Sequence, residues 1–342
     1  MLPVFVFGLV VLNFVAFSSL ANSNDVVLAE NGYEANDYSY RYPMYDVTLA
    51  FGDSITQLGY EHENSGWVTH LSNRYVRNMD VLNRGFSAFS TRRAKDIAHV
   101  VFPVRKGAYA NGSPVDGSSG WFGWLTNGAR NIKQKVFKDD SLATNNWPEN
   151  KRPFPARRSK VQLCILFFGA NDAADPRDYR HIPLAEYSLN LRYLINMLRN
   201  PASMYYAPET RILIITPPAV GDKMSKETFM KYGWTYGPHK NVVTKKYAEA
   251  AVDVAKDLDM PYVDMWTAIE SRVQESRKHL AAEPSLESRK DNRYDGYDEF
   301  LIDGLHLNSK GNELLYNLLV ETIDKNWPEL HPRHVTTSDY YE

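Results

Sequence analysis

The sequence predicts an α/β fold in which a mostly parallel sheet of about five strands lies between two layers of helices, as in flavodoxin-like α/β/α folds. Short apolar runs that end in glycine or proline alternate with longer segments that have helical apolar spacing. The clearest runs are 161–168, which precedes Gly169, and 211–216, which precedes Pro217. Because strands of a covered parallel sheet are buried on both faces, such continuous runs favour helices on each side.

The first half of the chain provides two further strands and a helix. Residues 47–51 are apolar and end at Gly52, as expected for a buried strand. Trp67, Leu71 and Tyr75 recur every four residues and therefore share one helical face. Residues 81–82 indicate a second, shorter strand.

The second half repeats the alternation. Residues 183–199 carry apolar side chains on one helical face, and they precede the 211–216 strand. Residues 240–259 predict the next helix, and 262–263 predict the last strand. A final helix, capped by Asn308 or Ser309, has an apolar face formed by Leu314, Leu315, Leu318, Leu319 and Ile323.

One domain spanning 45–330 accommodates all these elements. Within it, 104–160 is rich in glycine, proline, serine and asparagine and is predicted to be an insertion, and loops of that length are functional or disordered. Residues 24–44 are polar and rich in tyrosine, which predicts a tail or linker, and 331–342 predict a C-terminal tail.

The N-terminal residues 1–23 predict a secretory signal peptide. Residues 2–17 are almost all apolar, and Ala21-Asn22-Ser23 fits a cleavage site with small residues. No lysine or arginine precedes the apolar run, and an uncleaved membrane anchor is the alternative. We therefore expect a secreted protein or one of the secretory pathway, with a cytoplasmic location as the alternative.

Composition excludes some classes of function. Lysine and arginine number 39 against 41 aspartates and glutamates, a net charge of −2, so the chain lacks the basic surplus of a nucleic-acid-binding protein. The single cysteine, Cys164, lies in the 161–168 run, where we expect it to be a buried hydrophobic residue. No intrachain disulfide can form.

Polar motifs follow three of the predicted strands, at the edge where parallel sheets bind ligands. Gly52-Asp53-Ser54 presents a serine after the first strand. Gly85 allows close approach of a backbone N–H after the second. Gly169-Ala170-Asn171-Asp172 supplies an amide donor toward developing negative charge. Taken singly, each motif is also explained by an ordinary turn.

A fourth motif, Asp303 to His306, precedes the final helix. An aspartate three residues before a histidine can hold the imidazole N–H in a tight turn and stabilise the imidazolium. An exposed loop at a helix entry is the alternative interpretation. The signatures Gly-x-Ser-x-Gly, His-Glu-x-x-His, Walker A and Gly-x-Gly-x-x-Gly are absent from the sequence.

Together the four motifs resemble the blocks of the SGNH (GDSL-type) hydrolase superfamily, and within it the isoamyl acetate-hydrolysing esterases. The resemblance implies that Ser54, Asp303 and His306 form a catalytic triad. It also implies that the oxyanion is bound by the Ser54 N–H, the Gly85 N–H and the Asn171 side chain.

The resemblance covers roughly 46–324 without the insertion and includes 183–191, 214–218 and 263–266. It implies a serine esterase that hydrolyses short-chain, acetate-type esters of small molecules through an acyl-enzyme, with a role in lipid degradation. No cofactor or metal is expected, because no Cys/His cluster has ligand spacing. Contact with a membrane is expected only if the N-terminal segment stays as an anchor, and the oligomeric state is open.

Two other classes of function stay open at this point. One is a carbohydrate acetylesterase, with Trp121, Trp124 and Trp147 of the insertion stacking on sugars, or a lysophospholipase or thioesterase of the same fold. The other is a non-catalytic ligand-binding module.

Overall fold

The computed structural model describes residues 45–104, 159–233, 237–282 and 295–332. The predicted leader (1–23), the predicted tail or linker (24–44), almost all of the predicted insertion (104–160) and most of the predicted tail (331–342) lie outside the described residues.

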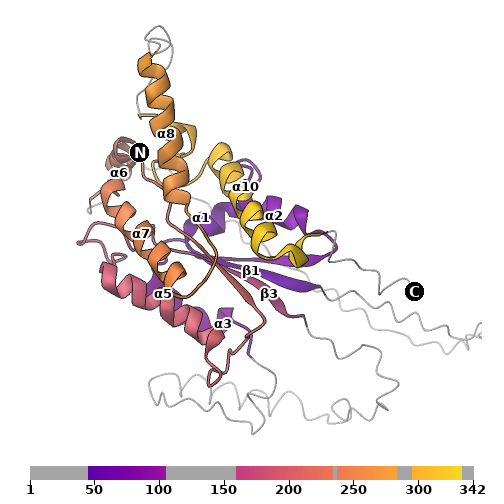
Figure 1. The fold of residues 1–342 in the computed structure, drawn as a ribbon. Coiled ribbons are helices and arrows are strands. Elements are labelled where there is room, and N and C mark those ends of the chain that lie inside the picture. Colours follow the sequence, from indigo (N-terminus) through magenta and orange to yellow (C-terminus); the bar gives the residue numbers. More distant parts are fainter. Residues whose placement is uncertain (1–44, 105–158, 234–236, 283–294, 333–342) are drawn as a thin grey trace, which may run out of the picture. The chain divides into compact units, whose positions relative to one another are not determined.

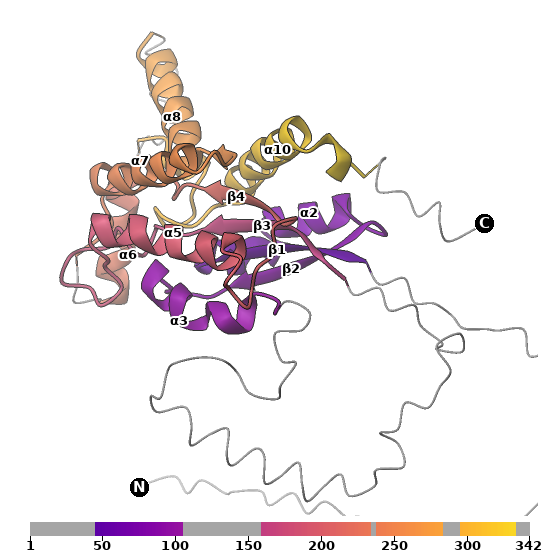
Figure 2. The same cartoon turned by 60° about the horizontal axis from the view of Figure 1, so that its bottom comes forward.

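A parallel sheet of five strands forms the centre of the fold, with the strand order β2-β1-β3-β4-β5 (Figure 2). The strands are β1 (Asp46–Gly52), β2 (Met79–Gly85), β3 (Val161–Phe167), β4 (Arg211–Ile215) and β5 (Tyr262–Val263). Each contains or closely matches a run that the sequence predicted, so the expected α/β class and the five strands are confirmed.

Helices cover both faces of the sheet (Figure 1). One face packs against α3 (Thr91–Val101), α5 (Leu184–Arg199) and α7 (Asn241–Asp257), and the other against α2 (Trp67–Arg74), α8 (Met265–Ala282) and α10 (Ser309–Asn326). Alternate residues of a strand serve opposite cores: Leu49 and Phe51 face the α5 layer, whereas Ala50 faces the α2 layer. Cys164 is buried in the α5 layer, and burial raises the pKa of its thiol to about 12.

The remaining elements among the described residues are short or peripheral. They are α1 (Ser54–Gln57), η1 (Leu58–Tyr60), α6 (Asp222–Tyr232), η4 (Tyr297–Glu299) and η5 (Pro328–Leu330). In the part of the chain that the structure describes, no helix combines the length and apolar character that a bilayer crossing requires.

The register of the sheet brings the ends of neighbouring strands together. Gly52 of β1 lies opposite Gly85 of β2 on one side and Phe167 of β3 on the other. The three strands therefore end at the same level, and the segments that follow them leave the sheet at one edge. This edge receives the motifs at Ser54 and Asn171.

α10 is fastened beside α2 by one buried side chain. Asn312 Oδ1 accepts the Trp67 N–H at 3.3 Å, and Asn312 Nδ2 donates to the carbonyls of Asn64 at 3.0 Å and Leu307 at 3.3 Å. The Asn308 side chain caps the helix by accepting the Gly311 N–H, as predicted for one of two candidate caps. The segment before α10 is thereby held close to the beginning of the fold.

Candidate active site

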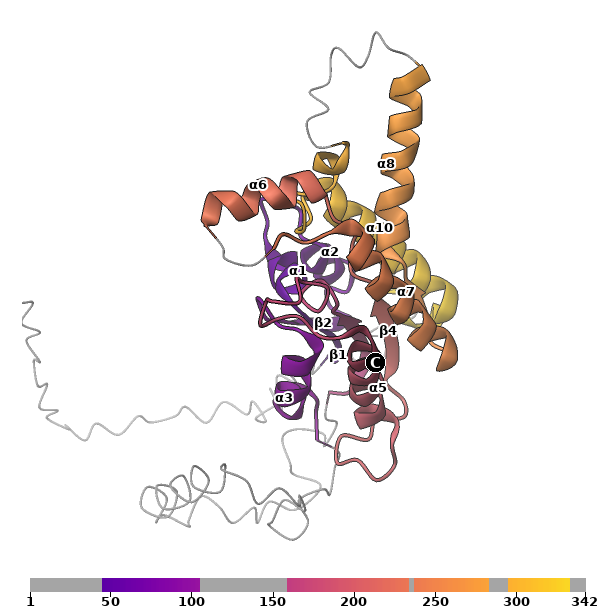
Figure 3. The same ribbon diagram turned by 90° about the vertical axis from the view of Figure 1, so that its left-hand side faces the viewer.

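Ser54 is the first residue of α1, the short helix that follows the carboxyl end of β1. Figure 3 shows α1 close to the sheet, below α6. Asp53 caps this short helix, because its Oδ1 accepts the Ile55 N–H at 2.9 Å. The turn from β1 into α1 is tight: a Cβ on Gly52 would lie 2.0 Å from Thr56 Oγ1. The serine is 7% exposed, so its hydroxyl occupies a fixed and largely dry position.

A second tight loop carries Asp303 and His306. Ile302 donates its N–H to the His306 carbonyl at 2.9 Å, and Leu301 pairs with Leu307 in an antiparallel bridge, which closes the loop. Gly304 has φ +91°, and a Cβ there would lie 2.4 Å from the Ser225 backbone nitrogen of α6, so only glycine fits.

The loop explains the spacing of aspartate and histidine. Asp303 Oδ1 accepts the backbone N–H groups of Leu305 at 2.9 Å and His306 at 2.8 Å. Its other oxygen, Oδ2, lies 2.7 Å from His306 Nδ1. With Nδ1 carrying the proton toward Asp303, Nε2 is an acceptor, and it lies 2.9 Å from Ser54 Oγ. Such a line of hydroxyl, imidazole and carboxylate can pass the serine proton to the imidazole.

The pKa values fit this arrangement. Burial alone lowers the pKa of His306, but the hydrogen bond and charge of Asp303 outweigh burial, and the pKa lies above its ordinary value. Burial likewise works to raise the pKa of Asp303, yet its bonds to His306 bring it to about 2. The carboxylate therefore stays ionised beside the imidazole.

Two further carboxyl groups lie buried next to this line. Burial raises the pKa of Asp53 to about 7, against the opposing effects of the Ile55 N–H and of His306. Burial also raises the pKa of Asp172 to about 7, although Thr91 donates to it from both its N–H and its hydroxyl. The two aspartates interact with each other, and Asp53 Oδ2 has no hydrogen-bond partner among the described residues.

Asn171 lies in the turn after β3, and Gly169 enters this turn with φ +126°. The Asn171 side chain is buried, and its Nδ2 donates to the Phe89 carbonyl at 3.1 Å. Arg180 Nη1 donates to Asn171 Oδ1 at 3.4 Å. One of the two N–H bonds on Nδ2 therefore stays available to a ligand.

Gly85 allows β2 to pass directly over α1. A Cβ on Gly85 would lie 2.0 Å from the Gln57 backbone nitrogen. In this structure the Gly85 N–H donates to Asn83 Oδ1 at 2.8 Å, and Asn83 Nδ2 donates to the Thr56 carbonyl at 2.7 Å. Asn83 thus ties the end of β2 to α1, a contact that sequence reasoning did not anticipate.

Sequence reasoning also missed a charged group beside Asn171. Arg180 pairs with Asp178 at 2.5 Å, and Asp178 is 4% exposed. His239 lies within electrostatic reach of this pair and of His306, and its pKa is lowered to about 4, chiefly by burial and then by Arg180. The one sequence signal was the repeated Asp-x-Arg at Asp175/Arg177 and Asp178/Arg180, and it does not tell which copy is buried.

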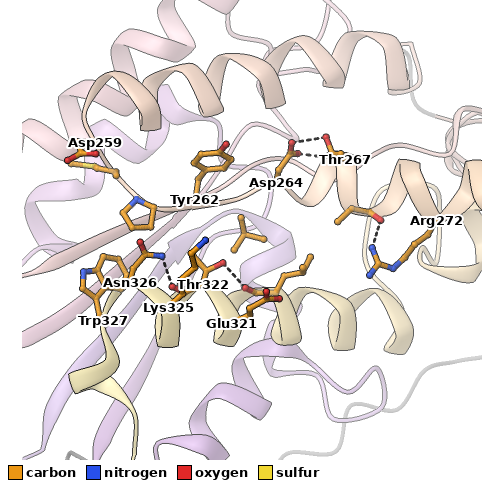
Figure 4. Close-up of a pocket in the computed structure, with 15 residues that line it drawn as sticks. Asp259, Tyr262, Asp264, Thr267, Arg272, Glu321, Thr322, Lys325, Asn326 and Trp327 are labelled. Atoms are coloured by element: carbon orange, nitrogen blue, oxygen red, sulfur yellow. Dashed lines mark hydrogen bonds between the residues drawn. The ribbon is translucent and has the colours of Figure 1, made fainter.

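A cavity of about 860 Å³ lies elsewhere, along β5 and between α8 and α10 (Figure 4). Its polar side chains include Asp264, which accepts from Thr267, together with Arg272 and Lys325. None of its lining residues belongs to the line of Ser54, His306 and Asp303. Among the described residues, no group of three or more His, Cys, Asp or Glu side chains is placed to hold a metal ion.

The sequence of the chain is similar to those of known proteins. Residues 50–314 match the GDSL-like lipase/acylhydrolase family. An isoamyl acetate-hydrolyzing esterase 1 homolog of Rattus norvegicus is 31% identical over 284 residues, which cover 82% of this chain and 83% of that protein. A GDSL esterase/lipase of Arabidopsis thaliana is 28% identical over a region that covers 78% of this chain and 80% of the Arabidopsis protein. The crystal structure of the lipase/acylhydrolase from Enterococcus faecalis aligns with a TM-score of 0.43 at 20% identity, covering 82% of this chain and 96% of that one.

Proposed function

The chain belongs to the GDSL-like lipase/acylhydrolase family of carboxylic ester hydrolases, and we propose that it is a serine esterase. Its proposed substrates are short-chain acyl esters, acetate esters first among them. The observation that carries the proposal is the contact of Ser54 Oγ with His306 Nε2 at 2.9 Å, continued by the contact of His306 Nδ1 with Asp303 Oδ2 at 2.7 Å.

In the first half of the reaction, Ser54 Oγ attacks the carbonyl carbon of the ester. Its proton moves to His306 Nε2, and Asp303 stabilises the imidazolium that results. The tetrahedral intermediate then expels the alcohol, which takes the proton back from Nε2. Such general acid–base help contributes about 10²–10⁴-fold to the rate. The products are an acyl-serine and the free alcohol.

In the second half, water replaces the alcohol. His306 Nε2 removes a proton from the water as the water attacks the acyl-serine, and it returns a proton to Ser54 Oγ when the carboxylic acid leaves. Because one imidazole serves both halves, the reaction needs no further acid or base.

The oxyanion is stabilised by donors at the edge of the sheet. Ser54 heads α1, so its N–H has no acceptor inside the helix. The second N–H of Asn171 Nδ2 is the next donor. The Gly85 N–H joins them once Asn83 Oδ1, its present acceptor, turns away.

A fluorophosphonate ester tests the proposal directly, because it reacts with an activated serine and mimics the tetrahedral intermediate. We expect stoichiometric labelling at Ser54, with the site identified by peptide mass spectrometry, and no labelling of Ser54→Ala. The exposed Ser271→Ala provides the matched control and should label like the wild type. Failure of the wild type to label would sink the proposal and favour a non-catalytic binding module.

The acyl preference is tested with p-nitrophenyl esters of increasing chain length. Short-chain acyl preference predicts the highest kcat/KM for acetate and a steady decline above butyrate. Acetylated sugars, a lysophospholipid and an acyl thioester complete the panel. A higher kcat/KM on any of these than on simple acetate esters would replace the proposed substrate class with that one.

We further propose that the protein enters the secretory pathway, which is supported by the apolar run and small-residue site within 1–23. Sequencing the N-terminus of protein recovered from its native source tests the proposal. A mature chain that starts near residue 24 supports it, an intact leader on protein from the membrane fraction indicates the anchor instead, and an intact leader on protein from the cytosol contradicts it.

A further inference from the structure

We propose that Arg180 is a positioning residue that sets the orientation of the Asn171 amide and thereby aims its free N–H at the oxyanion; this inference rests on the proposed esterase function. Arg180 Nη1 lies 3.4 Å from Asn171 Oδ1. It contacts the amide rather than the reacting atoms, so its effect on the reaction passes through Asn171.

The two contacts of the amide select one of its two orientations. Oδ1 accepts from the Arg180 guanidinium, and Nδ2 donates to the Phe89 carbonyl at 3.1 Å. Rotating the amide by half a turn would place its NH₂ against the guanidinium and its oxygen against a carbonyl oxygen. Both new contacts would be repulsive, because donor would meet donor and acceptor would meet acceptor. The side chain therefore keeps one N–H toward Phe89 and the other toward the site.

Arg180 is itself fixed. Its Nε lies 3.0 Å from Asp178 Oδ1, and its Nη2 lies 2.5 Å from Asp178 Oδ2, which is a bidentate pair. The Arg180 backbone N–H also donates to Asp178 Oδ1, at 2.9 Å. Asp178 is 4% exposed, and the guanidinium stacks against the Tyr179 ring at 5.9 Å. Of the two terminal nitrogens of Arg180, Nη2 thus donates to the Asp178 carboxylate and Nη1 to the Asn171 amide oxygen.

This arrangement matters because oxyanion donors act by being oriented before the reaction. A donor that must rotate into place costs free energy at the transition state, whereas a fixed donor does not. A positive charge next to Oδ1 also polarises the amide and makes its N–H a stronger donor. Arg180 is therefore expected to affect kcat more than KM, since the negative charge on the oxygen exists only in the transition state.

The chain contains a matched control for this residue. Arg177 forms the same local pair with Asp175, through Nε at 2.8 Å and Nη2 at 3.0 Å, but its side chain is 72% exposed. Removing Arg180 alone would leave the Asp178 carboxylate buried and unpaired, which is destabilising. The test therefore uses the double variant Asp178→Asn/Arg180→Gln, with Asp175→Asn/Arg177→Gln as its surface counterpart.

The kinetic test measures kcat and KM on p-nitrophenyl acetate, with kcat expressed per serine labelled by the fluorophosphonate so that misfolded protein is not counted. We expect the Arg180 double variant to lose roughly tenfold in kcat with KM changed less than about twofold, and the Arg177 double variant to keep both. In an Asn171→Ala background the Arg180 substitutions should have no further effect. An equal loss in both backgrounds, or a rise in KM at constant kcat, overturns the inference.

A second readout needs no turnover. The Asn171 side-chain amide is assigned in a ¹H–¹⁵N spectrum as the signal lost in Asn171→Ala. We expect the Arg180 double variant to shift that signal and the Arg177 double variant to leave it in place; an unmoved signal in the Arg180 variant refutes the positioning role. Absence of ester hydrolysis in the wild type would refute the proposed function instead, so the two failures are read separately.

Discussion

Ser54 Oγ and His306 Nε2 lie 2.9 Å apart, although 252 positions separate the two residues in the sequence. β1 and Asp53, the N-cap of α1, place the serine, whereas a closed loop before α10 places the imidazole. The contact therefore depends on how α10 packs against the beginning of the fold. Asn312 contributes to this packing through its bonds to the Trp67 N–H and the Asn64 carbonyl, and Arg74 of α2 pairs with Asp324 of α10.

Asp303→Asn should move the pH profile of kcat/KM. In the proposed mechanism His306 must be neutral to accept the serine proton, and Asp303 holds the pKa of His306 above the ordinary 6.5. Wild-type activity should therefore fall on the acid side with a midpoint above 6.5, and the variant's midpoint should be lower. The rate should also fall, by up to about 10⁴-fold, because the wrong tautomer is no longer disfavoured. The profile is measured from about pH 5 to 9 with the exposed Asp298→Asn as control, and an unchanged midpoint would contradict the assignment.

Asn171→Ala should lower kcat by about 10²–10³-fold, which is about 2.7–4 kcal/mol in the barrier, the usual loss for one oxyanion donor. KM should change little, because the lost bond forms mainly in the transition state. Steady-state kinetics on p-nitrophenyl acetate measure both constants, and Asn326→Ala on the surface of α10 serves as control. Unaltered kcat would mean that the Gly169–Asp172 motif is only a turn.

Asp53→Asn should stabilise the protein at alkaline pH and much less at acid pH. Burial raises the pKa of Asp53 from its ordinary value of 3.8 to about 7, so the folded state binds the proton more tightly than the unfolded state. Between these values the unfolded state holds fewer protons, and stability falls as pH rises. Asparagine keeps the cap to Ile55 and removes this loss, which amounts to about 4 kcal/mol at most.

Urea denaturation at about pH 5 and pH 8 checks this prediction, because these values lie on either side of the raised pKa. The free energy of unfolding of Asp53→Asn minus that of the wild type should be larger at about pH 8 than at about pH 5. For the exposed Asp80→Asn control, the difference from the wild type should be the same at the two pH values. A pH-independent difference would show that burial does not raise the pKa of Asp53.

Gly85→Ala should impair both stability and catalysis. The new Cβ would lie 2.0 Å from the Gln57 nitrogen and 2.5 Å from its Cα, so α1 must move, and Ser54 with it. We expect a cost of about 1–3 kcal/mol, as for other overpacked sites, together with reduced kcat. Gly233→Ala is the control: its φ of +64° is unfavourable for alanine, but no atom lies within 4 Å of the Cβ. It should lose about 1 kcal/mol and keep full activity per labelled serine.

Most of the fold could be predicted because its strands are continuous apolar runs. β2 was the exception in length: the expected strand was 81–82, but it spans Met79–Gly85. As an edge strand, β2 tolerates Asp80 and Arg84, which interrupt the apolar pattern. Three helices, α3, α6 and α8, were missed because each buries few or small side chains. The buried face of α3 is formed by Thr91, Ala94 and Ala98. α6 buries just two of its residues, and α8 buries a narrow stripe formed by Met265, Ile269 and Val273.

The candidate site was predicted from its four motifs, and the structure brings Ser54, His306 and Asp303 into hydrogen-bonding distance. What sequence could not reveal is how the surrounding side chains share their hydrogen bonds. Asn83 Oδ1 accepts the Gly85 N–H, and Arg180 contacts Asn171. The Asp-x-Arg pattern of Arg180 and its partner Asp178 also occurs three residues earlier, where Arg177 is exposed. These contacts depend on tertiary burial rather than on local spacing.

The late position of the imidazole has a consequence for synthesis. At about 5–20 residues per second, His306 is translated roughly 10–50 s after Ser54, and the Asn312 contacts that seat its loop arise later still. In the proposed mechanism, Ser54 of a nascent chain therefore has no base until His306 has been made. If Ser54 and His306 act as proposed, esterase activity is expected only after the C-terminal helix has emerged and docked, and a product truncated before His306 is expected to be inactive.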